Sequence, residues 1–319
     1  MEKEFTWEFE SLDSYLRVFC KKYGYPDEAI CSLSDTLKSL CDNKEELGIF
    51  KGYIDAYSEN IDQEFTKILD ELYVMAERAG LWCSTLRLLY LIFLTNHLHE
   101  MYIQKNIPDE VFDGSVCDLK WKLFECHKLT GRWGILVAWW TVGFFNMKRF
   151  ALGRLQFDVK PLQYSCTVNG IHLEKGTPTL NTHIPSCGPL VREEYLESYL
   201  RAVDFFADKF PDGYTVFACN SWLMHPNNRV ILPKHSNILP FMNDWTPVFS
   251  KDDPENSNAW NIFGISKLPE NLEDLPCDTS IQRAFSTWLK EGHNIGTSLA
   301  IMLYKNGKLL NQNEMGTVL

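Results

Sequence analysis

The spacing of apolar residues changes near Arg149, and this change constrains the fold more than any other feature of the sequence. Before it, apolar residues recur every three to four positions, which is the spacing of amphipathic helices. After it, segments such as "GRLQFDV" alternate polar and apolar residues, as half-buried strands do. We therefore predict an α+β protein, in which an all-helical N-terminal domain (residues 1–148) precedes a mixed-sheet domain with flanking helices (residues 149–319).

The helical spacing is clearest in residues 7–19, 30–40 and 53–75. Two longer apolar runs follow, Leu81–Leu94 and Gly134–Met147. A helix that crosses a membrane needs about 20 apolar residues, and both runs are shorter. We predict that they are buried helices and that the chain has no membrane partner.

The second half contains recognisable turn signals. "VNGIHL" and "YKNGKLL" each place Asn-Gly between strand-like residues, which predicts two hairpins. Strands are predicted over Gly213–Met224 and in "AWNIFGI", and helices over 191–209 and in "SIQRAFSTWLKEG".

The charge of the chain limits its partners. With 31 basic and 42 acidic residues among 319, the net charge is −11. Nucleic acids and anionic membranes bind proteins through an excess of basic residues, which this chain lacks. Both are therefore unexpected as partners.

The ten cysteines show no Cys-x-x-Cys pair, so zinc ribbons and dithiol redox motifs are not expected. No group of His, Cys, Asp and Glu residues has the spacing of metal ligands, and no metal is predicted. The start "MEKEFTWEFE" is acidic and lacks the basic and apolar regions of a signal peptide. We expect a cytoplasmic protein with reduced thiols.

The segment "HIPSCGPLVREEYLESYLRAVDFF" places a tight turn between a strand and an amphipathic helix. A turn of this kind presents backbone N–H groups at the positive end of a helix dipole, where phosphate groups bind. An ordinary strand–helix connection has the same pattern, so the spacing alone does not separate the two interpretations.

Six short sequence segments, taken in their order along the chain, favour one interpretation of this turn. They are "GRWGILVAWW", "LGRLQFD", "HIPSCGPL", "NSWLMHP", "SNILPF" and "LPCDTSIQRAFSTWLKEGHNIG". From about Ile107 to its end, the chain resembles a bacterial acyltransferase family. That family joins a helical N-terminal N-acyltransferase domain to a domain similar to the GCN5-related N-acetyltransferases (GNAT).

The resemblance implies an acyl-coenzyme A donor. In that superfamily, the strand before the main helix binds pantetheine, and the following turn and helix start bind the pyrophosphate. The residues implied here are Thr182, His183 and Ile184 for pantetheine, and Ser186, Cys187, Gly188, Leu190 and Val191 for the phosphates. Asn220, Ser221 and Asn237 are further candidates for contacts to the donor.

One departure from the superfamily pattern leaves an alternative open. Its phosphate loop is usually rich in glycine, whereas this loop has only Gly188, and Pro185 and Pro189 supply no N–H groups. The main hypothesis is transfer of an acyl group to a small-molecule acceptor, an amine in most such enzymes, by direct attack in a ternary complex. The alternative is a catalytically inactive GNAT-like binding or sensor protein.

Individual residues also have two interpretations. His183 is the candidate general base, and it fits a structural histidine as well. Cys187 at a helix start is a possible nucleophile, but no third group that would orient it is visible, so a spectator thiol is favoured. Arg154 and Gln156 face either the acceptor or, for Arg154, the acids of the N-terminal domain. Tyr195 and Tyr199 look like packing residues.

Overall fold

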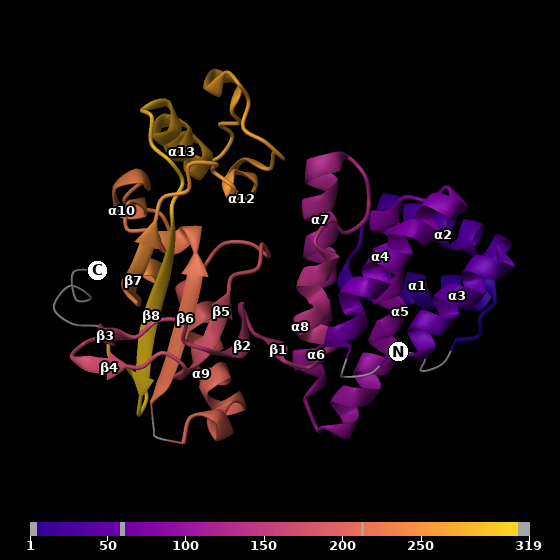
Figure 1. The fold of residues 1–319 in the computed structure, drawn as a ribbon, viewed down its shortest axis with the longest axis horizontal. Helices are drawn as coiled ribbons and strands as arrows, with labels where there is room; N and C mark the ends of the chain where they lie inside the picture. The colour runs from indigo at the N-terminus through magenta and orange to yellow at the C-terminus, as the bar shows by residue number, and fades with distance from the viewer. Residues whose placement is uncertain (1–4, 58–60, 212–213, 312–319) are drawn as a thin grey trace. The chain divides into compact units, whose positions relative to one another are not determined.

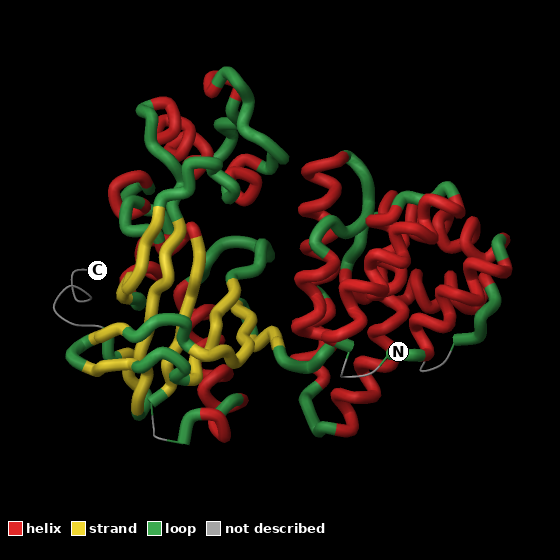
Figure 2. The backbone as a smooth tube through the Cα atoms, viewed as in Figure 1, coloured by secondary structure: helices red, strands yellow, loops and turns green. Residues whose placement is uncertain are grey.

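The computed structural model describes residues 5–57, 61–211 and 214–311. The chain forms two compact units, Met1–Ala151 and Leu152–Leu319, which are described separately here. Helices make up most of the first unit, and strands appear from Arg149 onward (Figure 2). The predicted α+β class, helical first and mixed sheet second, is confirmed.

In the first unit, the long helix α5 (Cys83–Gln104) is buried around most of its circumference. A helix that is apolar on all sides is stable only when other helices surround it, and the predicted buried helix at Leu81–Leu94 is thus confirmed. No helix in the described residues is long and apolar enough to cross a membrane. The other helices are α1 (Phe9–Tyr23), α2 (Asp27–Asp42), α3 (Lys44–Asp55), α4 (Asp62–Ala79), α6 (Asp109–Val116), α7 (Asp118–Thr130), η1 (Ala138–Thr141) and α8 (Val142–Phe145).

The predicted single helix over residues 53–75 is wrong, because α3 ends at Asp55 and α4 begins at Asp62. Ile54 and Ile61 are both buried, so the apolar spacing continues from one helix into the next and hides the break. Residues 58–60 of this prediction lie outside the described residues.

The predicted helix over Gly134–Met147 is also wrong, since only η1 and the four-residue α8 are helical there. The chain at Gly134 lies so close to α5 that a Cβ atom would be 2.7 Å from the carbonyl carbon of Ser84. The next N–H, that of Ile135, donates to the Ser84 carbonyl. Residues 131–137 contain no helix and contact α5 through Gly134 and Ile135, and Trp139 in η1 is exposed.

The second unit is built on a mixed sheet with the strand order β2-β5-β6-β8-β7, and β9 pairs with β8 (Figure 1). Only β5 and β6 are parallel to each other, and α9 makes the crossover between them. The strands of the unit are β2 (Leu155–Pro161), β3 (Cys166–Val168), β4 (Ile171–Leu173), β5 (Pro178–His183), β6 (Thr215–Ser221), β7 (Thr246–Lys251), β8 (Thr297–Lys305) and β9 (Lys308–Leu309), while β1 (Arg149–Leu152) spans the division between the units.

Both predicted hairpins are confirmed. β3 pairs with β4 and β8 pairs with β9, and each tip is an Asn-Gly pair with positive φ at both residues. This is the backbone conformation that favours Asn-Gly in two-residue turns.

Helix α9 (Arg192–Phe205) covers one face of the sheet. Its Tyr199 ring packs on Phe217 of β6 with ring centroids 5.5 Å apart, and Phe217 contacts Phe157 of β2 at 5.9 Å. Tyr195 and Tyr199 are both buried, as predicted for packing residues.

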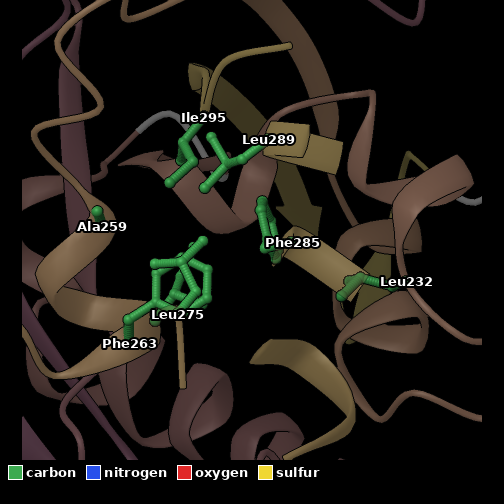
Figure 3. Close-up of a cluster of buried hydrophobic side chains, with 8 residues drawn as sticks. Leu232, Ala259, Phe263, Leu275, Phe285, Leu289 and Ile295 are labelled. Atoms are coloured by element: carbon green, nitrogen blue, oxygen red, sulfur yellow. The ribbon is translucent and has the colours of Figure 1, made fainter. Parts of the chain in front are cut away.

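A second core lies in the long connection between β6 and β8, as Figure 3 shows. Its buried residues are Leu232, Ala259, Ile262, Phe263, Leu275, Phe285, Leu289 and Ile295. Trp222 packs against this cluster, with its ring centroid 5.6 Å from that of Phe285. The helices here are η3 (Trp222–Met224), α10 (Asn228–Ile231), α11 (Ile238–Asn243), α12 (Ala259–Phe263), η4 (Leu272–Asp274) and α13 (Ser280–Lys290), and η2 (Ala207–Lys209) follows α9.

Two strand predictions need correction. "AWNIFGI" forms the helix α12, because Ala259, Ile262 and Phe263 are buried at helical spacing. The predicted strand Gly213–Met224 is shorter, since β6 ends at Ser221 and η3 follows; Gly213 lies outside the described residues. The edge strand β7 was not predicted, and its Pro247 beside a register shift is tolerated only at a sheet edge.

We predict that Gly296→Ala destabilises the second unit. A Cβ atom at residue 296 would overlap the buried imidazole ring of His225. Overpacking of this kind costs about 1–3 kcal/mol, so thermal unfolding should shift down by several degrees. Gly48→Ala in α3, where a Cβ atom meets nothing within 4 Å, is the control and should not lower the melting temperature. Failure of a second change, His225→Ala, to restore any stability would contradict this explanation.

Candidate active site

The parallel strands β5 and β6 separate along their length. They pair only at Leu180 with Phe217 and Asn181 with Ala218. On their outer sides, β5 pairs with β2 as far as His183, and β6 pairs with β8 as far as Ser221. Beyond residues 181 and 218, the facing edges of the two strands are not paired with each other in the described residues, and we call this unpaired stretch the slot.

A group of polar side chains lies at the β5 wall. The Nε2 atom of His183 is 3.0 Å from Oδ1 of Asp158, and the Asn181 side-chain amide donates to the same oxygen over 2.7 Å. Asp158 is almost fully buried, and Lys160 Nζ lies 3.4 Å from its other oxygen. Alternation along β2 and β5 places this group on the sheet face opposite Phe157 and α9.

Asp158 gives His183 a charged partner at one ring nitrogen. The Asn181 side-chain nitrogen also lies 3.0 Å from Nε2, so this ring nitrogen faces both the carboxylate and the amide. In the tautomer in which Nε2–H donates to the carboxylate, the lone pair that accepts a proton is on Nδ1. The arrangement has the chemistry of a general base held by a carboxylate. Asp158 was not identified from the sequence, because it is 25 positions from His183 and the register of β2 against β5 is not visible in the sequence.

The turn after β5 is held from within by Arg154. Its guanidinium donates to the main-chain oxygens of Pro185 (3.1 Å), Gly188 (2.6 Å) and Pro189 (3.1 Å). Neither of the two roles considered for Arg154 from the sequence, facing the acceptor or pairing with N-terminal acids, included these bonds.

Asn237 holds the next carbonyl, since its side-chain amide donates to the Leu190 oxygen over 3.4 Å. In a trans peptide, the N–H of the following residue points opposite to the carbonyl. The N–H groups of Ser186, Leu190 and Val191 are thus directed away from the side chains that hold the turn. Asn237 stands at the N-cap of α11, but its side chain makes no cap bond to that helix.

The first turn of α9 carries both signs of charge. Arg192 donates to Tyr195 Oη and, over 3.4 Å, to the fully buried Asp244. Burial, with the nearby Asp244 carboxylate, raises the pKa of Tyr195 to about 12, so the phenol is neutral at ordinary pH. The exposed Glu193 and Glu194 lie in the same turn.

The remaining predicted residues lie around the slot and the turn. Thr182 is buried and pairs with Phe157 of β2, and its hydroxyl donates to the Leu180 carbonyl. Ser221 Oγ accepts from the Leu223 N–H and caps η3, while Asn220 is exposed at the end of β6. Ile184, Ser186, Cys187 and Gly188 are at least partly exposed, and Leu190 is buried.

The thiols near the site differ in exposure. Burial raises the pKa of Cys219 on β6 to about 12, so this cysteine is a thiol and no nucleophile at neutral pH. Cys187 is partly exposed in the turn. No group of three metal-ligating side chains occurs in the described part of the chain.

Two family models match the chain in succession. Residues 14–147 match the N-acyltransferase N-terminal domain, and residues 150–302 match the GNAT-like C-terminal domain. The two halves of the chain belong to these two domain families. The resemblance found in the sequence is confirmed, and the slot, the turn and α9 all lie in the GNAT-like unit.

Solved acyltransferase structures share this fold. A complex with decanoyl-CoA and teicoplanin is 21% identical, with a TM-score of 0.67 over 89% of this chain and 86% of that chain. An acyltransferase mutant with octanoyl-CoA is 20% identical, with a TM-score of 0.67 over 90% and 87%. A complex with CoA and 10C-Teicoplanin is 19% identical, with a TM-score of 0.63 over 90% and 98%. No curated protein matches the sequence significantly.

Proposed function

We propose that the protein is an acyltransferase that moves an acyl group from acyl-CoA to an amine of a small molecule. The observation that carries this proposal is that β5 and β6 stop pairing with each other just before a turn whose carbonyls are held by Arg154. The two domain families and the acyl-CoA complexes of proteins with the same fold support it.

The slot fits the pantetheine part of the donor. Pantetheine has two amides, and the main chain of Thr182–Ile184 can pair with them as a neighbouring strand would. Asn220 and Ser221 lie on the opposite wall.

The pyrophosphate fits the turn Ser186–Val191. Its outward N–H groups and the start of α9 attract anions, and no atom lies within 4 Å of a Cβ built at Gly188, so a phosphate can approach closely.

The transfer itself needs a base and no covalent intermediate. His183 takes a proton from the attacking amine, and Asp158 holds the ring and stabilises its positive charge. The nitrogen–carbon bond forms as the carbon–sulfur bond breaks, and the thiolate that leaves takes up a proton. Both reactants are bound together, because direct attack requires a ternary complex.

A second candidate is a non-catalytic protein that senses acyl-CoA. Pro185 and Pro189 reduce the number of donors in the turn, and the carboxylates of Glu193 and Glu194 oppose a bound phosphate. Release of free thiol from acetyl-CoA in the presence of a mixed panel of amines distinguishes the two: an enzyme releases thiol with at least one amine, whereas a sensor binds acetyl-CoA without consuming it.

We predict that Gly188→Val abolishes most binding of coenzyme A in calorimetry. The valine places a branched side chain where the phosphate approaches, and a φ of +118° at this residue also strains it. Gly176→Val is the matched control, because Gly176 has a φ of +92° and open space around it in another turn of the same unit.

The control variant should lose similar stability and keep its affinity for coenzyme A. If wild type and Gly188→Val are both folded and bind coenzyme A with equal affinity, the turn is not the phosphate site. If the wild type does not bind coenzyme A at all, the proposed function is wrong.

His183→Ala should lower kcat by about 10²–10⁴, the usual contribution of a general base, with little change in KM for the acyl donor. Asp158→Asn should lower kcat by at least about tenfold, because the amide no longer fixes the ring as the carboxylate does. His172→Asn, which changes an exposed histidine of β4, serves as the control. A structural His183 would instead give unfolding with unchanged activity per folded molecule.

Cys187→Ser should retain most activity, because direct attack of the acceptor needs no thiol. Steady-state kinetics of this variant test the prediction, and mass spectrometry of the wild type mixed with acyl-CoA supplies a second measurement. A loss of several orders of magnitude together with an acylated Cys187 would show covalent catalysis instead.

A further inference from the structure

Arg154 is a buried arginine whose side chain donates to no carboxylate among the described residues. It is 9% exposed, and its guanidinium donates to three main-chain oxygens of the turn that follows β5. A buried charge is costly unless hydrogen bonds satisfy it, and here main-chain carbonyls supply those bonds. The buried charge of Arg154 therefore depends on the carbonyls of the turn, and the conformation of the turn depends on Arg154.

The position of Arg154 is fixed by α9, the helix that begins after the turn. The Arg154 N–H donates to Ser198 Oγ over 2.8 Å, and the Leu155 N–H donates to the same atom over 3.3 Å. Gly153, with a φ of +86°, permits this approach, since a Cβ there would lie 2.8 Å from Ser198 Oγ. One serine of α9 thus places the arginine that holds the turn leading into α9.

The hydrogen bonds also set the electrostatics of the turn. Three carbonyl oxygens carry partial negative charge, and without Arg154 nothing in these contacts would keep them turned inward. The planar guanidinium has several donors in a fixed fork, so it can hold three oxygens at once, which the single ammonium group of lysine cannot do equally well. It adds a positive charge beneath the turn, opposite in sign to the nearby Glu193 and Glu194.

We infer that Arg154 is the positioning residue that makes this turn a receptor for the phosphates of the donor. The inference rests on the proposed function. It also predicts which ligands depend on Arg154. The affinity for ligands that carry the pyrophosphate should depend on Arg154, whereas the affinity for pantetheine alone, which lies along β5, should not.

The test compares four ligands of increasing length by competition calorimetry. They are pantetheine, 4′-phosphopantetheine, 3′-dephospho-coenzyme A and coenzyme A. Arg154→Met should weaken binding of the two pyrophosphate ligands by about tenfold or more, equivalent to about 1.4 kcal/mol per tenfold, with pantetheine unchanged. Arg154→Lys should recover only part of the loss. Arg201→Met, which removes an exposed arginine of α9, is the control and should change none of the four affinities.

The outcomes separate the inference from the proposed function. Wild-type binding of coenzyme A tests the function, and only the difference between ligands tests Arg154. An equal loss for pantetheine and coenzyme A, or no loss for either, would overturn the inference while the function stands. Absence of wild-type binding to coenzyme A would overturn both.

A second variant guards against misfolding of Arg154→Met. Asn237→Ala removes the donor to the Leu190 carbonyl from an exposed side chain, so it should fold normally. It should weaken the two pyrophosphate ligands by a few-fold and leave pantetheine unchanged. If Arg154→Met does not fold and Asn237→Ala shows no difference between the ligands, holding the carbonyls is not what prepares the turn, and the inference is wrong.

Discussion

The candidate site depends on two neighbouring strands that are each fully paired on their outer side and barely paired with each other. β2 fixes the register of β5 over its whole length, and β8 does the same for β6. Neither strand can shift to close the gap without losing its outer ladder. The main-chain groups on the inner edges are thus held in place for a partner that itself carries amides.

Local signals in the sequence were sufficient for much of this fold. Helical spacing located α1, α2 and α5, and Asn-Gly pairs located both hairpins, because these features depend on residues close together in the chain. The strand, turn and helix around Gly188 were also predicted, and the ordered phrases named the correct domain families. Spacing misled where two elements share one apolar period, as at Ile54 and Ile61, and where a short apolar segment suits either structure, as in α12. It also misled in the apolar run Gly134–Met147, where only η1 and α8 are helical.

The contacts that form the candidate site were harder to predict from the sequence, since they join residues that are brought together only by the pairing of strands. His183 was identified, but its partner Asp158 becomes a neighbour only through the pairing of β2 with β5. Arg154 was noted as a polar residue on a strand, yet its partners are main-chain oxygens 31 to 35 positions away. Backbone carbonyls have no signature in a sequence, so an arginine that binds them cannot be told from one that binds a carboxylate.

The two prolines of the turn take on a different meaning beside Arg154. Each removes one N–H group, which weakens the turn as an anion site, but each also fixes its own φ angle. Two of the three oxygens that Arg154 holds belong to these same prolines. The turn therefore has fewer N–H donors but a more rigid backbone. Binding to a rigid turn costs less conformational entropy than binding to a turn that the ligand must order. Such a site can bind phosphate in a chain of net charge −11, because its attraction comes from fixed local dipoles and one buried guanidinium instead of a basic surface.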